Sequence, residues 1–119
     1  IMKRVILMFT MFLAVSLFTA SCEDEESATQ FSINDTFDEV RNGVRLILYF
    51  DAQSSTFVGS IENTTDKAIS KIRVEVHLSN GTELGPTANT DLAPGEIKNV
   101  SLPAISENFE TWGAHAEVG

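Results

Sequence analysis

Residues 69–78, with the sequence ISKIRVEVHL, decide the fold class of this chain. From residue 72 onward, apolar side chains occupy every second position and charged side chains or histidine stand between them. This period of two is typical of a β-strand that has one face toward a core and the other toward water. One choice of face fixes all the others, because successive side chains point to opposite sides. We therefore expect the side chains of one face to be buried, namely Ile72, Val74, Val76 and Leu78. Those of the other face, Arg73, Glu75 and His77, should be exposed.

Turn signals separate further strands on both sides of this segment. Asn42-Gly43 and Asn80-Gly81 each follow an apolar run, and such pairs favour type I′ hairpin turns, which need positive φ at both central positions. Pro94-Gly95 fits the centre of a type II turn. We expect seven strands, at residues 37–41, 44–50, 56–63, 69–78, 82–84, 97–102 and 109–118. Residues 35–42 are the one rival candidate for a helix.

For two of these strands, the sequence also predicts burial or a local irregularity. In residues 44–50, Ile47 and Tyr49 point away from the face that holds the other apolar side chains. We therefore expect this strand to be covered on both sides. In residues 97–102, the spacing between Ile97 and Val100 breaks the alternation. This spacing indicates a β-bulge near Lys98 and Asn99.

Length and charge limit the class of protein. The chain has 119 residues, enough for one small domain, with 8 basic and 17 acidic side chains and a net charge of −9. Such an acidic surface repels phosphate backbones, so the composition argues against nucleic-acid binding. One cysteine excludes an internal disulfide and a cysteine-based metal cluster.

The first residues have the pattern of an export signal. Lys3 and Arg4 precede an apolar run at residues 5–20, which is shorter than the roughly 20 residues that a membrane span needs. Ala20 and Ser21 then precede Cys22, which resembles a bacterial lipobox, although Thr19 replaces the usual leucine. The resemblance implies cleavage before Cys22, lipidation of its sulfur and anchoring in the outer membrane of a Gram-negative bacterium. The alternative is an ordinary secretory signal with an incidental cysteine.

Four acids follow this cysteine: Glu23, Asp24, Glu25 and Glu26. A run of like charges is usually a solvated tether. Its place directly after Cys22 also resembles the surface-export signal of Bacteroidota lipoproteins, which implies display on the cell surface. An anchor that faces the periplasm is the alternative. The domain organisation that we expect is a signal peptide at 1–21, an acidic tether at 22–30 and a folded domain at 31–119.

The folded part resembles a known family. A strand at 57–63, the alternating strand at 69–78, the Asn80-Gly81 turn and the Leu-Ala-Pro-Gly-Glu corner at 92–96 occur in the order seen in FxLYD-type domains of envelope proteins. The resemblance covers about residues 56–102 and implies an immunoglobulin-like β-sandwich, with little said about activity. Leu78-Ser79-Asn80 replaces the family's Leu-Tyr-Asp. The hairpin at 35–50 and the ending at 112–117 look instead like a related family of small lipoproteins of unknown function.

Motifs for chemistry are sparse. His77 and His115 could pair as metal ligands, but no third ligand is evident in the sequence, so we expect two surface histidines and no metal or cofactor. Asn63, Asp66 and Asp91 could form a calcium site, but they are better explained as solvated turn residues. The sequence contains no nucleophile motif or phosphate-binding glycine loop, and we expect no enzyme.

Two functions remain open at this stage. The leading expectation is a non-enzymatic, lipid-anchored envelope protein that binds an unknown protein partner. The alternative is a carbohydrate-binding accessory lipoprotein, which would need exposed aromatic rings. Tyr49 and Trp112 are the candidates for that role, and Trp112 is better explained as a core residue.

Overall fold

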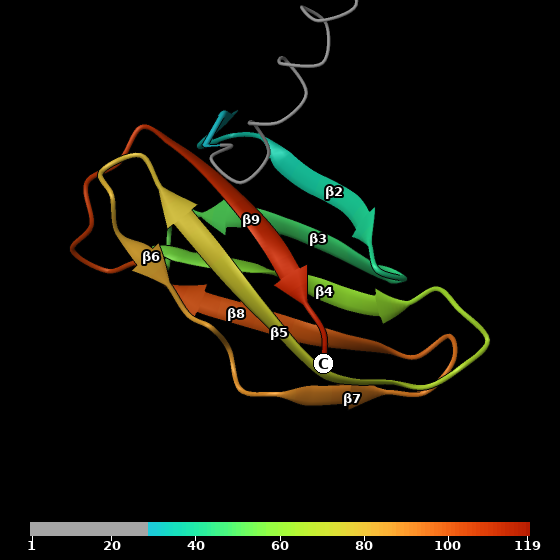
Figure 1. Cartoon of the computed structure of the whole chain (residues 1–119). Coiled ribbons are helices and arrows are strands. Elements are labelled where there is room, and N and C mark those ends of the chain that lie inside the picture. Colours follow the sequence, from blue (N-terminus) through green and yellow to red (C-terminus); the bar gives the residue numbers. More distant parts are fainter. Residues whose placement is uncertain (1–28) are drawn as a thin grey trace, which may run out of the picture.

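The computed structural model describes residues 29–119, which form two antiparallel β-sheets packed in a sandwich-like arrangement (Figure 1). The expected signal peptide, Cys22 and the acids at 23–26 lie outside the described residues. Within residues 29–119 there is no helix, and hence none long and apolar enough to cross a membrane. The expected all-β class is confirmed.

The described part contains nine strands. Their bounds are β1 Phe31–Ser32, β2 Thr36–Arg41, β3 Val44–Asp51, β4 Thr56–Asn63, β5 Ile69–Leu78, β6 Glu83–Leu84, β7 Thr90–Leu92, β8 Ile97–Pro103 and β9 Thr111–Glu117.

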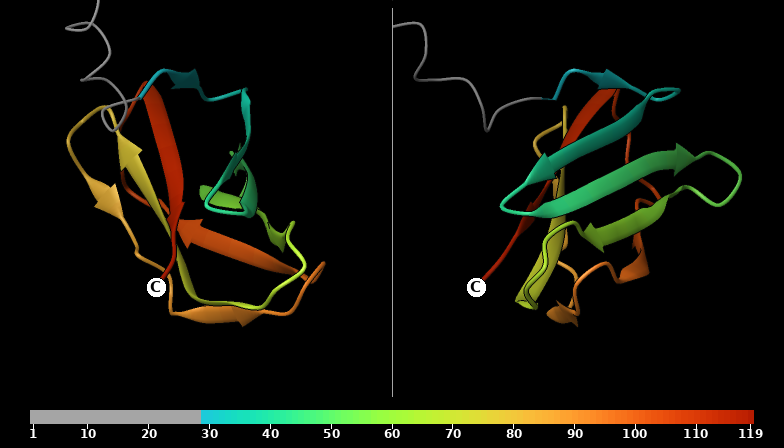
Figure 2. Two further views of the ribbon diagram at one scale, coloured as in Figure 1. Left: turned by 45° about the vertical axis from the view of Figure 1, so that its right-hand side comes forward. Right: turned by 90° about the vertical axis from the view of Figure 1, so that its right-hand side faces the viewer.

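The strands divide between two sheets, which we call sheet A and sheet B. Sheet A has the order β1-β9-β5-β6, and β7 also pairs with β5. Sheet B has the order β2-β3-β4-β8. Figure 2 shows β2, β3 and β4 side by side in one layer, with β5 and β9 in the other. The chain changes sheets between β1 and β2, β4 and β5, β7 and β8, and β8 and β9.

All seven expected strands are present, and residues 35–42 belong to a turn and β2 rather than to a helix. The two additional strands, β1 and β7, are only two and three residues long. Segments this short cannot show a period of two, so the sequence pattern did not reveal them.

The register of β5 is the expected one, but its outer face is less exposed than expected. Ile72, Val74 and Val76 are completely buried, and Leu78 is 3% exposed. The side chains of the other face are only 17% exposed for Glu75 and 31% for His77. The expectation of a fully wet face was wrong, because side chains from β6 and β9 stand beside those of β5 on the outer face.

Two of the three expected turns have the predicted conformation. At Asn80-Gly81 a turn does connect β5 to β6, but only Gly81 has a positive φ, of 93°, and its N–H donates to the Leu78 oxygen, so this turn is not of type I′. Asn42 and Gly43 have φ angles of 53° and 83°, and they connect Arg41 to Val44, which pair directly across the β2–β3 hairpin. This is the conformation that an Asn-Gly type I′ turn requires. At the β7–β8 corner, the Glu96 N–H donates to the Ala93 oxygen, and Gly95 takes the positive φ of a type II turn.

Two expectations for sheet B were wrong. Strand β3 is not covered on both sides, since Tyr49 is 47% exposed and Ile47 is half-buried. Strand β8 has no bulge, because it pairs with β4 in continuous register from Ile97 to Pro103. In that register Ile97 lies on the outer face and is 58% exposed, so the apolar spacing reflected an exposed isoleucine and not a bulge.

The core is organised around Trp112, which is fully buried as expected. Its ring centroid lies 4.8 Å from that of Phe57 in sheet B and 5.5 Å from that of Phe31 in β1. The indole Nε1 donates to the backbone oxygen of Ser32 at 2.8 Å. Trp112 therefore joins both sheets and the first strand, and its ring is not available for stacking on a ligand.

Candidate functional site

The outer face of sheet A holds a cluster of two histidines and three acids. Glu75 of β5 pairs directly with His115 of β9, and His77 of β5 pairs with Gly113 of β9 and with Glu83 of β6. Because side chains alternate along each strand, Glu75, His77 and His115 all point to the same side of the sheet. Gly113 has no side chain, which leaves space beside His77 for the ring of His115.

Three potential ligand atoms converge in this cluster. Glu75 Oε1 lies 3.2 Å from His115 Nε2 and 3.8 Å from His77 Nε2. The ligand atoms of the three side chains all lie within 4.8 Å of one another. The two imidazole rings are stacked, with centroids 5.1 Å apart and planes at 20°. The expectation that the histidines lack a third ligand was therefore wrong, because β5 places Glu75 next to both.

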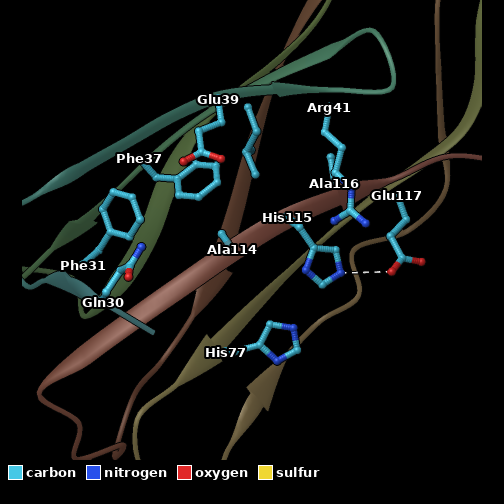
Figure 3. Close-up of a pocket in the computed structure, with 11 residues that line it drawn as sticks. Gln30, Phe31, Phe37, Glu39, Arg41, His77, Ala114, His115, Ala116 and Glu117 are labelled. Atoms are coloured by element: carbon cyan, nitrogen blue, oxygen red, sulfur yellow. Dashed lines mark hydrogen bonds and ion pairs between the residues drawn. The ribbon is translucent and has the colours of Figure 1, made fainter. Parts of the chain in front are cut away.

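Further charges surround the three side chains. Glu117 of β9 has its Oε2 3.0 Å from His115 Nε2, as Figure 3 shows, and its Oε1 3.3 Å from Arg73 Nη2. Glu83 Oε1 lies 3.9 Å from His77 Nδ1. Arg73 pairs with one of the three acids, and Arg41 of β2 lines the hollow beside the histidines. The three acids outnumber these two cations, so the balance of fixed charge around the histidines is negative.

The environment changes the acidity of Glu75. Burial against the sheet raises the pKa of its carboxyl above the ordinary value of 4.5, and the neighbouring Glu83 raises the pKa further. Glu117 acts in the same direction, while His115 opposes them. The surroundings of Glu75 therefore disfavour the ionised form of its carboxyl.

A hollow of about 510 Å³ adjoins this cluster, between β2 and β9. Glu39 and Arg41 line it from β2, and Ala114 and His115 line it from β9 (Figure 3). Glu39 and Arg41 share a face of β2 with the buried Phe37, yet both are exposed. The sandwich is therefore open along this seam, and one edge of the cluster faces the opening.

The outer face of sheet B has a different character. Tyr49 of β3 pairs with Val58 of β4, and Ile47 lies two residues along β3 on the same face. We call these three residues the apolar patch, and they line a depression of about 610 Å³. Two more exposed apolar residues, Val40 and Ile97, lie on the same outer face.

Charged residues border the apolar patch. The guanidinium of Arg45 donates two hydrogen bonds to the carboxylate of Asp38, which is the direct register partner of Ile47. These hydrogen bonds hold the pKa of Asp38 below its ordinary value. The patch is therefore an apolar surface with a charged rim, on the face of the sandwich opposite to the histidine cluster.

The suggested calcium residues do not form a site. Asn63 is fully buried, and its amide nitrogen donates to the backbone oxygens of Lys67 and Leu92. Its amide oxygen accepts from the N–H and hydroxyl of Thr65. Asp91 accepts the backbone N–H of Lys71. Asn63 thus fixes the corner between the two sheets, and its polar atoms are already used.

The sequence pointed to both histidines but not to Glu75. Alternation marks Glu75 only as a residue of the outer face, and the separation of 40 residues from His115 carries no local signal. The register between β5 and β9 is the signal that unites them, and only the folded chain contains it. The predicted lipidation site, Cys22, and the acids at 23–26 lie outside the described residues.

Comparison of the chain with protein-family models, with curated proteins and with solved structures finds no match.

Proposed function

We propose that the chain is a non-enzymatic lipoprotein of a bacterial outer membrane, anchored through Cys22, whose domain binds a partner protein. In this proposal the domain at residues 31–119 is an immunoglobulin-like β-sandwich of the FxLYD type. The acidic tether at 22–30 separates it from the membrane, and the acids at 23–26 direct it to the cell surface. A lipid-modified cysteine supplies the membrane affinity, because each buried CH₂ of its acyl chains contributes about 0.8 kcal/mol.

The immunoglobulin-like assignment is supported by the architecture. Two antiparallel sheets pack face to face around a buried tryptophan, as in sandwiches of that class. The order of the strands and turns at residues 56–102, including the Pro94-Gly95 corner, agrees with the FxLYD resemblance.

The exposed apolar patch is the observation that carries the binding function. Strand β3 has apolar residues on both faces, with Ile47 and Tyr49 on the outer one. Here the core covers one face, and nothing in residues 29–119 covers Tyr49 on the other. An exposed group of apolar residues with a charged rim is typical of a protein interface. A protein partner that presents an apolar surface with charged residues around it therefore fits the patch best.

A carbohydrate-binding accessory lipoprotein is the alternative, and it has less support. Glycan platforms use two or three aromatic rings, whereas Trp112 is buried and Tyr49 is the one strongly exposed ring among residues 29–119. A Tyr49→Ser variant that lost binding to a glycan, with no protein cross-linked at the patch, would favour the alternative.

The anchor is tested by metabolic labelling of cells with palmitate. We expect the wild type to carry label and to sediment with membranes, and Cys22→Ala to do neither. Replacement of Glu23, Asp24, Glu25 and Glu26 with neutral residues should leave the label intact but reduce protease shaving on intact cells. Unlabelled wild-type protein would refute the anchor, and equal shaving would refute the export signal.

The interface is tested in cells with a photo-cross-linking amino acid at position 49 and, as a control, at the exposed position 110. We expect a discrete adduct at position 49 alone. The cross-linked protein is then purified, and its affinity for the wild type is compared with that for Tyr49→Ser and Glu110→Ser. Binding should weaken at least about tenfold for the first variant and little for the second. Equal cross-linking at both positions would refute the patch as an interface.

A further inference from the structure

The histidine cluster on sheet A has no part in the proposed interface on sheet B. We propose that Glu75, His77 and His115 bind a divalent transition-metal ion, with Zn²⁺ as the ion that fits best. This inference goes beyond the proposed function and does not depend on it.

The ligand set is the first argument. Two imidazoles and one carboxylate are the three protein ligands of a familiar class of zinc sites in which water takes the fourth position. Imidazole nitrogens also distinguish among metals, since Mg²⁺ and Ca²⁺ prefer sites made only of oxygen. The cluster therefore fits Zn²⁺ and related ions, and not the alkaline-earth ions.

The geometry is the second argument. Ligand atoms around a tetrahedral Zn²⁺ lie 2.0–2.2 Å from the ion and hence roughly 3.3 Å from one another. Glu75 Oε1 is already 3.2 Å from His115 Nε2, and the widest separation within the set is below 4.8 Å. Small rotations of half-buried side chains close this difference. The backbone need not move, because the β5–β9 register already places the ligands on one face.

The surrounding acids are the third argument. In zinc sites, the ring nitrogen that does not bind the metal usually donates to a carboxylate or a backbone oxygen, which fixes the orientation of the ring. Glu83 lies on that side of His77, with its Oε1 3.9 Å from Nδ1 while Nε2 faces Glu75, and a small rotation of its side chain would bring it within hydrogen-bond distance. Glu117 adds negative charge next to His115 Nε2. Both acids would lower the energy of a bound cation.

A structural network of ion pairs is the competing explanation, and it predicts different behaviour. In such a network the histidines would be protonated to satisfy the acids, and added metal would change nothing. A metal site instead binds one ion at a pH where the imidazoles are neutral, and it depends on all three side chains. The experiment therefore measures metal binding and folding separately.

The test uses the full-length chain in detergent, purified without a polyhistidine tag and stripped with a chelator that is then removed. Zn²⁺ is titrated calorimetrically at about pH 7.5, above the ordinary pKa of histidine. The variants are Glu75→Gln, His77→Gln and His115→Gln. Glu62→Gln, which removes one acid from the outer face of sheet B, is the matched control for charge.

We expect one Zn²⁺ per wild-type chain. Each of the three variants should bind it at least about tenfold more weakly, and Glu62→Gln should bind within about twofold of the wild type. Mg²⁺ at the same concentration should not compete. Zn²⁺ should raise the melting temperature of the wild type and of Glu62→Gln, and it should raise that of the other variants less at the same Zn²⁺ concentration. Cooperative unfolding in metal-free buffer shows that each variant is folded.

Three results would overturn the proposal. They are the absence of saturable Zn²⁺ binding to the wild type, an affinity of the three variants for Zn²⁺ equal to that of the wild type, and competition by Mg²⁺ at the same concentration. The last two results would mean that Zn²⁺ binds nonspecifically to the many acidic side chains of the protein and not to this cluster. None of these results affects the proposed interface, which Tyr49→Ser tests on the other sheet.

Discussion

The indole Nε1 of Trp112 donates a hydrogen bond to the backbone oxygen of Ser32 across 80 residues of chain, at 2.8 Å. The hydrogen bond connects β1, the first strand, to β9, the last one. The two strands also pair directly, Phe31 with Trp112 and Ser32 with Thr111. Together with the Phe31–Trp112 ring contact, it explains how a two-residue strand remains attached to the sheet.

Trp112→Phe should therefore destabilise the domain by about 2 kcal/mol, through a cavity in the core and the loss of one of the two hydrogen bonds that the Ser32 oxygen accepts, the other coming from the Asp35 N–H. Urea unfolding, followed by circular dichroism, measures the change. Tyr49→Phe is the control, since its ring is exposed. A loss below about 0.5 kcal/mol for Trp112→Phe would contradict a central role for this residue.

Gly59 is required by the close approach of two strands. A Cβ at this position would lie 1.8 Å from the backbone oxygen of Ile47 on β3. We expect Gly59→Ala to cost about 3 kcal/mol or more, because backbone atoms in the centre of sheet B would have to move. Gly81→Ala is the comparison: it meets no atom within 4 Å, but its φ of 93° makes alanine strained, at about 1 kcal/mol. Equal melting temperatures for the two variants would contradict this account.

Asn63→Asp should be strongly destabilising. The amide nitrogen of Asn63 donates to two backbone oxygens, and a carboxylate oxygen in its place would face them without a proton to share. The expected loss is about 3 kcal/mol or more at neutral pH. Asn99→Asp makes the same chemical change at an exposed position of β8 and should stay within about 0.5 kcal/mol. Chemical denaturation of both variants decides the question.

Glu75 should make stability depend on pH in the metal-free protein. Its pKa in the folded chain is raised above 4.5, so folding favours the protonated form. The ionised side chain therefore costs stability as the pH rises from the ordinary glutamate value through the raised value. The charged groups that face it are His77 on its own strand, Glu83 from β6, and His115 and Glu117 from β9.

Glu75→Gln should accordingly gain stability relative to the wild type as the pH rises above the ordinary glutamate value of 4.5, and the two should converge at the acidic end. Thermal unfolding at a series of pH values, with chelator present, measures the difference. Glu62→Gln controls for the loss of one acid. If Glu75→Gln were less stable than the wild type at neutral pH without metal, the carboxylate would be stabilising and the assigned direction would be wrong.

Local patterns in the sequence were sufficient for the seven predicted strands and for two of the three predicted turns. The alternation at residues 72–78 fixed which side chains of β5 are buried, because a strand has only two faces. The Asn42-Gly43 pair fixed the β2–β3 hairpin, because few residues accept positive φ at both positions. Both signals act between neighbours in the chain, so they are readable without the fold.

The tertiary structure decided which strands lie next to each other, and with them the candidate sites. Ile97 was misread as evidence of a bulge, because only its pairing with Glu62 of β4 places it on the outer face. The same holds for the cluster of Glu75, His77 and His115, which depends on β9 returning beside β5. Hydrogen-bond register between strands distant in sequence is set by the packing of the whole domain, and no local pattern encodes it. The predicted export signal, in contrast, rests on the sequence alone, since the lipobox-like pattern at Cys22 is defined by the order of residues in the chain.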